Sequence, residues 1–368
     1  MQRRSARNVP HIQLIADGSG EALSHLFSGF GLLHQQGRAD VAMTRAAVYR
    51  PDANGSTSLR AVVDGDLRLA FDLIDGPQLR PDDLDWATTY FKRSYRSSEH
   101  GDDARVLPLG LNYPAYTPGD WRGTRAWWSL RSARPKTAKD AMVQIVRLNR
   151  PLSKVLSPNG GCLHADVETL EQEPRASEDP RIVMMTRVWD HTRIQGEKAD
   201  QWREMNDDRA RCVRAVREHF GSAATCGIAP SDYAQRFYPD CVIDEAVAAK
   251  PNYLRLMRAA DIGVATAGLR GSNGWRLGEY LAASKCIVTE PLQSEVPGGF
   301  AEGTNHLTFE DPDQCVEQCT LLMEDLDRRR AMMEANQRYY RSFVRPDGEV
   351  AHALERAGVP LAPGPERT

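Results

Sequence analysis

The feature that most constrains the fold is a regular alternation of strand-like and helix-like patterns between residues 181 and 290. Short apolar runs typical of buried strands alternate with stretches in which apolar residues recur every three or four positions. The strand-like runs are RIVMMTRVW, AATCGIA, DIGVAT and KCIVTE. This alternation predicts a parallel, doubly wound sheet, in which ligands bind at the carboxyl ends of the strands.

The N-terminal half indicates a second domain of the same class, because 368 residues exceed what one hydrophobic core usually serves. HIQLIAD reads as a strand, and a glycine turn and a helical pattern follow it. Further strands are expected at 41–46, 59–63, 67–74, 86–92 and 105–110. A polar, acidic stretch near 165 to 180 marks the boundary. We therefore expect domains at 1–170 and 171–345, followed by a helix end and a loose tail at 346–368.

Charge and cysteine content exclude several classes of protein. The 47 basic and 50 acidic residues leave a net charge of -3, which gives no overall field to attract nucleic acid. The seven cysteines are scattered, and no apolar segment approaches the ~20 residues of a membrane span. The sequence predicts a cytoplasmic protein without an export signal and with at most peripheral membrane contact.

The run GLRGSNGWRLGEYLAAS, which begins at residue 268, carries the clearest candidate site. Ser272 or Asn273 is expected to cap a helix that begins near Gly274. A helix N-terminus behind a glycine-rich loop binds anions, and a nucleotide diphosphate is the natural occupant. Glu279 lies about one and a half turns into that helix, within reach of a sugar hydroxyl. The alternative is an ordinary turn with a solvated Glu279.

The order of these elements resembles the C-terminal domain of GT-B glycosyltransferases of the group 1 type. The resemblance covers about 180 to 345 and extends through VPGGFAEGTNHLTFEDPDQCVEQCTLLMED, with its short strand ending in Phe309 and a helix start at 311–313. It implies an α/β protein with two Rossmann-like domains that face a cleft, the acceptor on the first and the nucleotide sugar on the second.

The resemblance also implies roles for particular residues. Many retaining members carry two glutamates eight positions apart, of which the second contacts the nucleotide ribose; Glu279 matches the second, and Gly271 stands in place of the first. Basic residues in the loop after the first strand of the domain offset the leaving-group charge without a metal or cofactor. Arg187, Arg193 and Lys198 occupy that loop, and each is alternatively a solvated surface cation.

Catalytic residues of the N-terminal half are predicted from position alone. Asp17 and His25 follow the first expected strand, where either is a candidate general base for an acceptor hydroxyl. Helix capping or core packing is the alternative for both. Lys92 and Arg93 stand at the end of the expected strand 86–92, where they would contact a phosphate or an acidic acceptor, or merely protect a sheet edge.

Metal binding is not predicted. Three acidic pairs have the D-x-D form, at 64–66, 83–85 and 311–313, but none follows a convincing nucleotide-binding half-sheet. The cysteines and histidines also lack the spacing of a zinc site.

The sequence thus predicts transfer of a sugar from a nucleotide diphosphate sugar to a hydroxyl acceptor, in glycan, polysaccharide or glycoconjugate synthesis. The acceptor is a carbohydrate, a lipid-linked molecule or a small molecule. Two alternatives stay open. One is a nucleotide-sugar epimerase of the same fold. The other is a non-catalytic protein that binds sugar nucleotides, which is suggested by Gly271 in place of the first glutamate.

Overall fold

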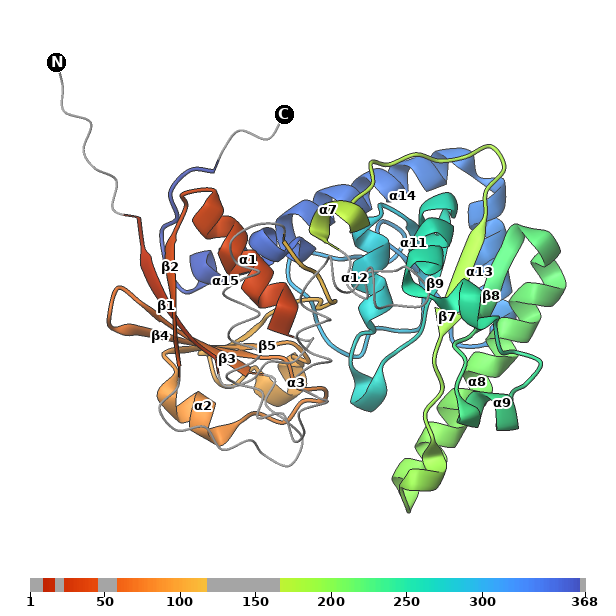
Figure 1. Ribbon diagram of the computed structural model, residues 1–368, viewed down its shortest axis with the longest axis horizontal. Helices are drawn as coiled ribbons and strands as arrows, with labels where there is room; N and C mark the ends of the chain where they lie inside the picture. The colour runs from red at the N-terminus through yellow and green to blue at the C-terminus, as the bar shows by residue number, and fades with distance from the viewer. Residues whose placement is uncertain (1–8, 17–22, 46–57, 118–165, 365–368) are drawn as a thin grey trace.

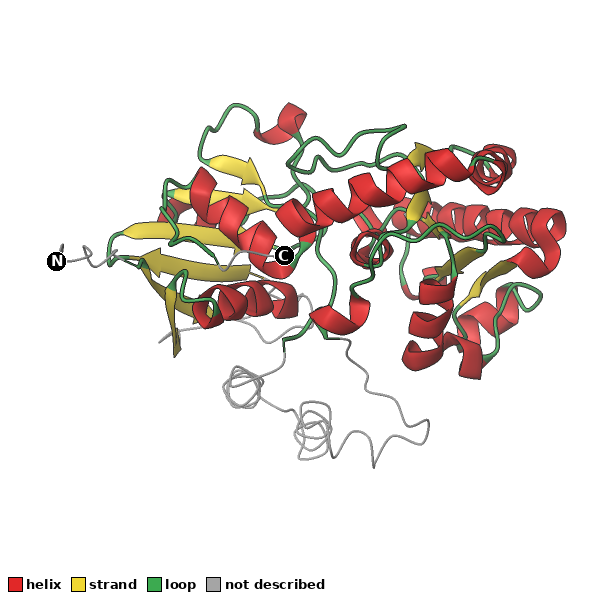
Figure 2. Cartoon of the chain, turned by 90° about the horizontal axis from the view of Figure 1, so that it is seen from above, coloured by secondary structure: helices red, strands yellow, loops and turns green. Residues whose placement is uncertain are grey.

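Two sheets separated along the chain organise the molecule (Figure 1). The computed structural model describes residues 9–16, 23–45, 58–117 and 166–364. Figure 2 shows the strands in two groups, with helices around and between them. The structure confirms the predicted α/β class with two Rossmann-like domains. Asp17 and the predicted glycine turn lie outside the described residues.

The N-terminal sheet has the strand order β2-β1-β3-β4-β5-β6. Its strands are β1 (His11–Ala16), β2 (Asp40–Arg45), β3 (Ser58–Val63), β4 (Leu67–Asp72), β5 (Thr89–Lys92) and β6 (Val106–Pro108). Its helices include α1 (Ser24–Gln35), α2 (Pro81–Trp86) and α3 (Ser97–His100). The sheet is not wholly parallel, because β3 runs antiparallel to both β1 and β4.

A tight hairpin turn explains the antiparallel strand. Asp64 and Gly65 join β3 to β4 with positive φ angles of 51° and 92°. An Asp-Gly pair between two strand patterns is a strong hairpin signal, since glycine adopts positive φ at no steric cost. The acidic pair at 64–66 is therefore a turn.

The C-terminal sheet is parallel throughout, with the order β11-β10-β9-β7-β8. Its strands are β7 (Ile182–Thr186), β8 (Ala224–Ile228), β9 (Ile262–Ala265), β10 (Cys286–Thr289) and β11 (Leu307–Thr308). The α-helices around it are α7 (Val167–Leu170), α8 (Glu197–Phe220), α9 (Asp232–Phe237), α10 (Glu245–Ala248), α11 (Lys250–Ala259), α12 (Trp275–Ala282), α13 (Pro312–Glu324) and α14 (Leu326–Tyr339).

Both faces of this sheet are covered, which explains why its strands are continuous apolar runs. Ile182 and Met184 of β7 point into a core formed with α8 and α13. Val183 and Met185 point into the opposite core, formed with α11 and α12. Asp311 caps α13 by accepting a hydrogen bond from the backbone N–H of Gln314, so the acidic pair at 311–313 is a helix start, as predicted.

The chain returns to the N-terminal domain at its end. A π-helical turn (Tyr340–Val344) joins α14 to α15 (Pro346–Arg356), which packs against α1. Val350 and Leu354 are fully buried in the N-terminal core. The tail that the sequence predicts to be loose contacts the first domain at residue 362. There, Arg38 and Ala362 exchange two hydrogen bonds.

The domain junction is broader than the sequence indicates. Leu111 and Tyr113, which follow the N-terminal sheet, pack in the same core as α11 and α12. Val167 and Leu170 of α7 join that core, although the predicted boundary assigned them to the first domain. No helix in the described parts of the chain has the length and apolar character needed to cross a bilayer.

Candidate functional site

The loop between β9 and α12 has a constrained backbone. The N–H of Gly268 donates to the carbonyl oxygen of Ser272 at 2.6 Å, and Arg270 and Gly271 adopt positive φ angles of 57° and 70°. A Cβ at Gly271 would lie 2.5 Å from Nη2 of Arg96. Gly271 therefore combines a left-handed backbone with a close side-chain contact, and a glutamate there would be strained.

The first turn of α12 has no side-chain cap. Gly274 takes the N-cap position, and the predicted capping by Ser272 or Asn273 is wrong. Both residues are buried, and Nδ2 of Asn273 donates instead to the carbonyl oxygen of Ser294 at 3.0 Å. The uncapped first turn leaves backbone donors at the carboxyl edge of the parallel sheet.

Glu279 is the centre of a buried polar cluster. Its Oε1 accepts from Nζ of Lys250 at 2.5 Å, and its Oε2 accepts from Nη1 of Arg276 at 2.5 Å and from the hydroxyl of Tyr253 at 2.9 Å. Burial acts to raise the pKa of Glu279, but Lys250 and Arg276 outweigh it and lower the pKa to about 2. The solvated-carboxylate alternative is wrong, since Glu279 is only 3% exposed.

The two cations of this cluster are more accessible than the carboxylate. The side chains of Lys250 and Arg276 are 23% and 30% exposed. The guanidinium of Arg276 lies 3.8 Å from the ring centroid of Tyr253, and its Nε donates to the carbonyl oxygen of Met185 at the end of β7. The cluster thus holds one positive charge in excess at the carboxyl edge of the sheet.

Neither cation was predicted. Arg276 stands three positions before Glu279, a spacing that places two helical residues side by side, so the sequence held a signal for this pair. Lys250 is 29 positions away and reaches Glu279 only through the packing of α11 against the sheet, for which the sequence holds no local signal.

A buried arginine braces the neighbouring strand ends. Arg209 of α8 donates at 2.6 Å to the carbonyl oxygens of Arg187 and Ala267. Burial lowers the pKa of Arg209, and Glu290 acts in the opposite direction. Oε2 of Glu290 accepts from the backbone N–H of Ala267, and burial raises the pKa of its carboxyl group. The loops after β7 and β9 are therefore fixed to each other.

The predicted basic loop lies beside this edge with its side chains outward. Arg187 follows β7 directly and is exposed. Arg193 is 83% exposed and pairs with Asp190 at 2.8 Å. Lys198 is exposed in the first turn of α8. Of the three, Arg187 is connected to the strand end before the glycine-rich loop, because Arg209 donates to its carbonyl oxygen and to that of Ala267.

His25 lies in the first turn of α1 and faces α15 and Tyr113. Its side chain is fully buried, Nδ1 lies 3.2 Å from the carbonyl oxygen of Tyr113, and Nε2 lies 3.0 Å from Oε2 of Glu349. Burial raises the pKa of Glu349, and His25 acts in the opposite direction. This placement gives His25 a packing role at the domain junction, and its catalytic role stays a prediction.

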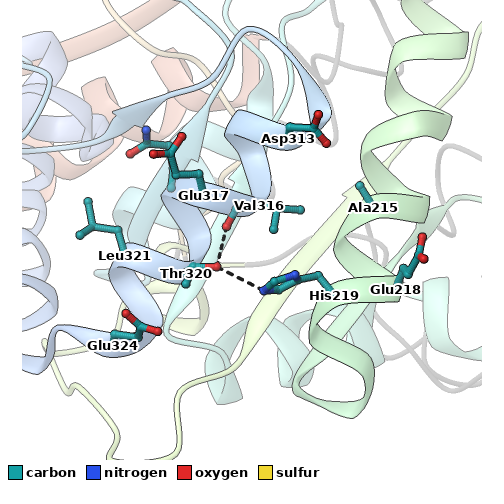
Figure 3. A pocket seen from close by; sticks show the side chains of 10 residues that line it. Ala215, Glu218, His219, Asp313, Val316, Glu317, Thr320, Leu321 and Glu324 are labelled. Carbon is teal, nitrogen blue, oxygen red and sulfur yellow. Dashed lines mark hydrogen bonds between the residues drawn. The ribbon is translucent and has the colours of Figure 1, made fainter.

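A groove elsewhere on the C-terminal domain does not include these residues. It has a volume of about 850 Å³ and lies between α8 and α13 (Figure 3). Its walls carry Glu218, Asp313, Glu317 and Glu324, with Leu321 at its rim. Acidic walls repel phosphates, so the candidate anion site is the edge beside α12.

Comparison with known proteins gives a family for part of the chain. Residues 203–347, less than half of the sequence, match the family described as Glycosyl transferase-like. This match confirms the resemblance of the C-terminal domain and supports a glycosyltransferase-type function. No curated protein matches the sequence.

Solved structures of similar fold share little sequence with this chain. The C-terminal domain of the group 1 glycosyl transferase LpcC from Francisella tularensis is 12% identical, covering 48% of this chain and 95% of that one, with a TM-score of 0.33. HepE from Anabaena with UDP-glucose is 10% identical, covering 73% and 72%, with a TM-score of 0.32. MnaA from S. aureus with UDP is 10% identical, covering 97% and 98%, with a TM-score of 0.40. At these low TM-scores they carry no conclusion about the substrate of this chain.

Proposed function

We propose that this protein is a glycosyltransferase that moves a sugar from a nucleotide diphosphate sugar to a hydroxyl acceptor. The family match of residues 203–347 supports the class of reaction. The single observation that supports a nucleotide diphosphate sugar as the donor is a pair of partly exposed cations beside the first turn of α12. These are Lys250 and Arg276, which buried Glu279 holds.

In this proposal the donor pyrophosphate lies over residues 271–274 and contacts the two cations. Glu279 orients Lys250 and Arg276, and it also remains the proposed ribose contact. Transfer of the sugar leaves a nucleoside diphosphate, whose developing charge needs fixed positive groups. Lys250, Arg276 and the backbone donors of α12 supply them, together with Arg187, Arg193 and Lys198 from the basic loop. We propose that the reaction therefore needs no metal.

The acceptor is proposed to lie on the N-terminal domain, with its hydroxyl deprotonated by a general base. Both ring nitrogens of His25 already face Tyr113 and Glu349, so Asp17 is the better of the two proposed bases. The acceptor is proposed to be a carbohydrate, a lipid-linked molecule or a small molecule.

The donor site is tested by the affinity of Arg276→Lys and Lys250→Ala for UDP, GDP and dTDP, measured by titration calorimetry. Loss of a charge-assisted hydrogen bond is expected to raise the dissociation constant of the nucleotide that binds by at least about tenfold. Arg330→Ala is the control, because Arg330 is an exposed arginine of α14 that pairs with Asp327 on the same helix. Equal affinities in the three variants would sink the assignment of the cations.

Turnover distinguishes the three candidate activities. A glycosyltransferase consumes UDP-, GDP- or dTDP-sugar only with an acceptor, and added EDTA leaves the rate unchanged. Interconversion of the donor without an acceptor would instead identify an epimerase. Nucleotide binding without transfer, interconversion or hydrolysis would identify a binding protein. No binding of any nucleotide would overturn the proposal.

A further inference from the structure

A segment of the N-terminal domain reaches the glycine-rich loop of the C-terminal domain. Arg93 follows β5 directly and is 7% exposed. Its Nη1 donates to Oδ1 of Asp75 at 2.8 Å, and its Nη2 donates to the carbonyl oxygen of Asn273 at 2.8 Å. One guanidinium thus joins a carboxylate of the first domain to the residue that precedes the N-cap of α12.

A second set of contacts lies beside it at the surface. The backbone N–H and the hydroxyl of Ser97 both donate to Oε1 of Glu295, at 2.7 and 2.5 Å. The N–H of Glu295 donates to the carbonyl oxygen of Tyr95, and Nε of Arg96 donates to that of Gln293. The loops after β9 and β10 therefore both touch the segment 93–97.

The two C-terminal loops are also joined to each other. Nδ2 of Asn273 donates to the carbonyl oxygen of Ser294, and the hydroxyl of Ser294 donates to the carbonyl oxygen of Gly271 at 3.1 Å. Within the glycine-rich loop, Arg270 and Gly271 have left-handed backbones and Leu269 is only half-buried. Side-chain packing alone therefore does little to hold this loop, and polar contacts fix its shape.

The contact of Arg93 differs from the surface contacts in strength. Ser97 and Glu295 are exposed, so water competes for their hydrogen bonds. Arg93 is buried, and its hydrogen bond to Asn273 is charge-assisted in a setting that excludes water. The exchange of this bond for one with water is correspondingly unfavourable.

We propose that Arg93 is a positioning residue that holds the loop before α12 in the shape able to receive the donor phosphates. The role in donor binding rests on the proposed function, whereas the restraint of the loop does not. Arg93 acts through the carbonyl oxygen of Asn273 and does not itself contact the donor. The order of the loop consequently depends on the segment 93–97 of the first domain as well as on the loop's own polar contacts.

Hydrogen exchange measured by mass spectrometry on the full chain without ligand tests the restraint. In Arg93→Ala, amides of residues 268–276 are expected to exchange at least about tenfold faster than in the wild type. Arg93→Lys is expected to restore part of the protection, because one ammonium group replaces only part of the two-pronged hydrogen bonding of the guanidinium. Arg60→Ala is the control, since Arg60 pairs with Asp83 inside the first domain. Unchanged exchange at 268–276 in Arg93→Ala would overturn the proposal.

The role of Arg93 in donor binding is tested by measuring, for each variant, both the affinity for UDP, GDP and dTDP and the melting temperature. We expect the dissociation constant to rise at least about tenfold in Arg93→Ala and partly recover in Arg93→Lys. Arg60→Ala is expected to lower the melting temperature without changing the affinity. If both alanine variants weaken binding equally, Arg93 is only structural. If no nucleotide binds the wild type, the proposed function fails, while hydrogen exchange still decides the restraint of the loop.

Discussion

At the scale of single residues, Glu279 shows how a buried carboxylate remains ionised. Burial alone penalises its charge, and Lys250 and Arg276 more than compensate, with the result that its pKa falls to about 2. Removing one member leaves the others buried with an unbalanced charge, which is more costly than replacing the whole cluster. The cluster therefore links the stability of the C-terminal domain to its binding chemistry.

The depressed pKa of Glu279 predicts how its contribution to stability depends on pH. A carboxyl group with a lower pKa in the folded state stabilises the fold above its unfolded pKa of 4.5, and this contribution is lost as the pH falls toward 2. Glu279→Gln is expected to cost roughly 3 kcal/mol at pH 7 and progressively less below pH 4.5. Urea unfolding at a series of pH values measures this difference. Glu324→Gln, at an exposed position of α13, is the control, and a Glu279→Gln cost that does not vary with pH would contradict the expectation.

At the scale of elements, the sequence was most informative where side-chain periodicity is strong. The apolar runs of β7, β9 and β10 and the helical pattern of α8 predict their elements, because both faces of a parallel sheet are buried. The strand β3 was predicted at 59–63, but its antiparallel direction was missed, although Asp64 and Gly65 signal a hairpin. The clustering of Lys250 with Glu279 depends on the packing of α11, and the position of Arg93 depends on the contact between domains. Local patterns do not encode either.

Gly271 shows what the loop before α12 demands of its sequence. Alanine there meets both a left-handed backbone and the guanidinium of Arg96, so Gly271→Ala is expected to destabilise the fold by roughly 1–2 kcal/mol. Gly299→Ala is a matched control, because Gly299 has a φ of 72° with nothing within 4 Å of the added Cβ. The difference between the two urea midpoints measures the contact. Arg96→Ala should reduce that difference, and the remainder is expected from Cβ of Gln293, which lies 3.2 Å from the added Cβ. An unchanged difference would show that Arg96 is not the neighbour that matters.

At the scale of the whole molecule, the two domains share structure at their junction. Tyr113 of the first domain contacts α12, where a Cβ on Gly278 would lie 2.6 Å from its ring. Its hydroxyl is 3.1 Å from that of Tyr340, which in turn donates to Glu171. Helix α15 then completes the core of the first domain. The positions of the two candidate substrate-binding halves are thus fixed by buried contacts.

Because α15 contributes to the core of the first domain, a core substitution in α15 is expected to destabilise that domain. Leu354→Ala removes a fully buried side chain from its core and is expected to cost about 2–5 kcal/mol. Urea unfolding measures the cost, and hydrogen exchange is expected to show β1 and α1 losing protection. Leu321→Ala, at a position of α13 that is 38% exposed, is expected to have little effect. Loss of protection confined to the C-terminal sheet would contradict the prediction.

The return of α15 also sets the order in which the molecule can be completed during synthesis. The ribosome makes the strands of the first domain early, but Val350 and Leu354 of their core are translated after the whole C-terminal sheet. The first domain to be synthesised is therefore the last that can close its core. Until α15 is made, the face of α1 that packs against it is uncovered, and a nascent chain that ends before α15 exposes that face to chaperones.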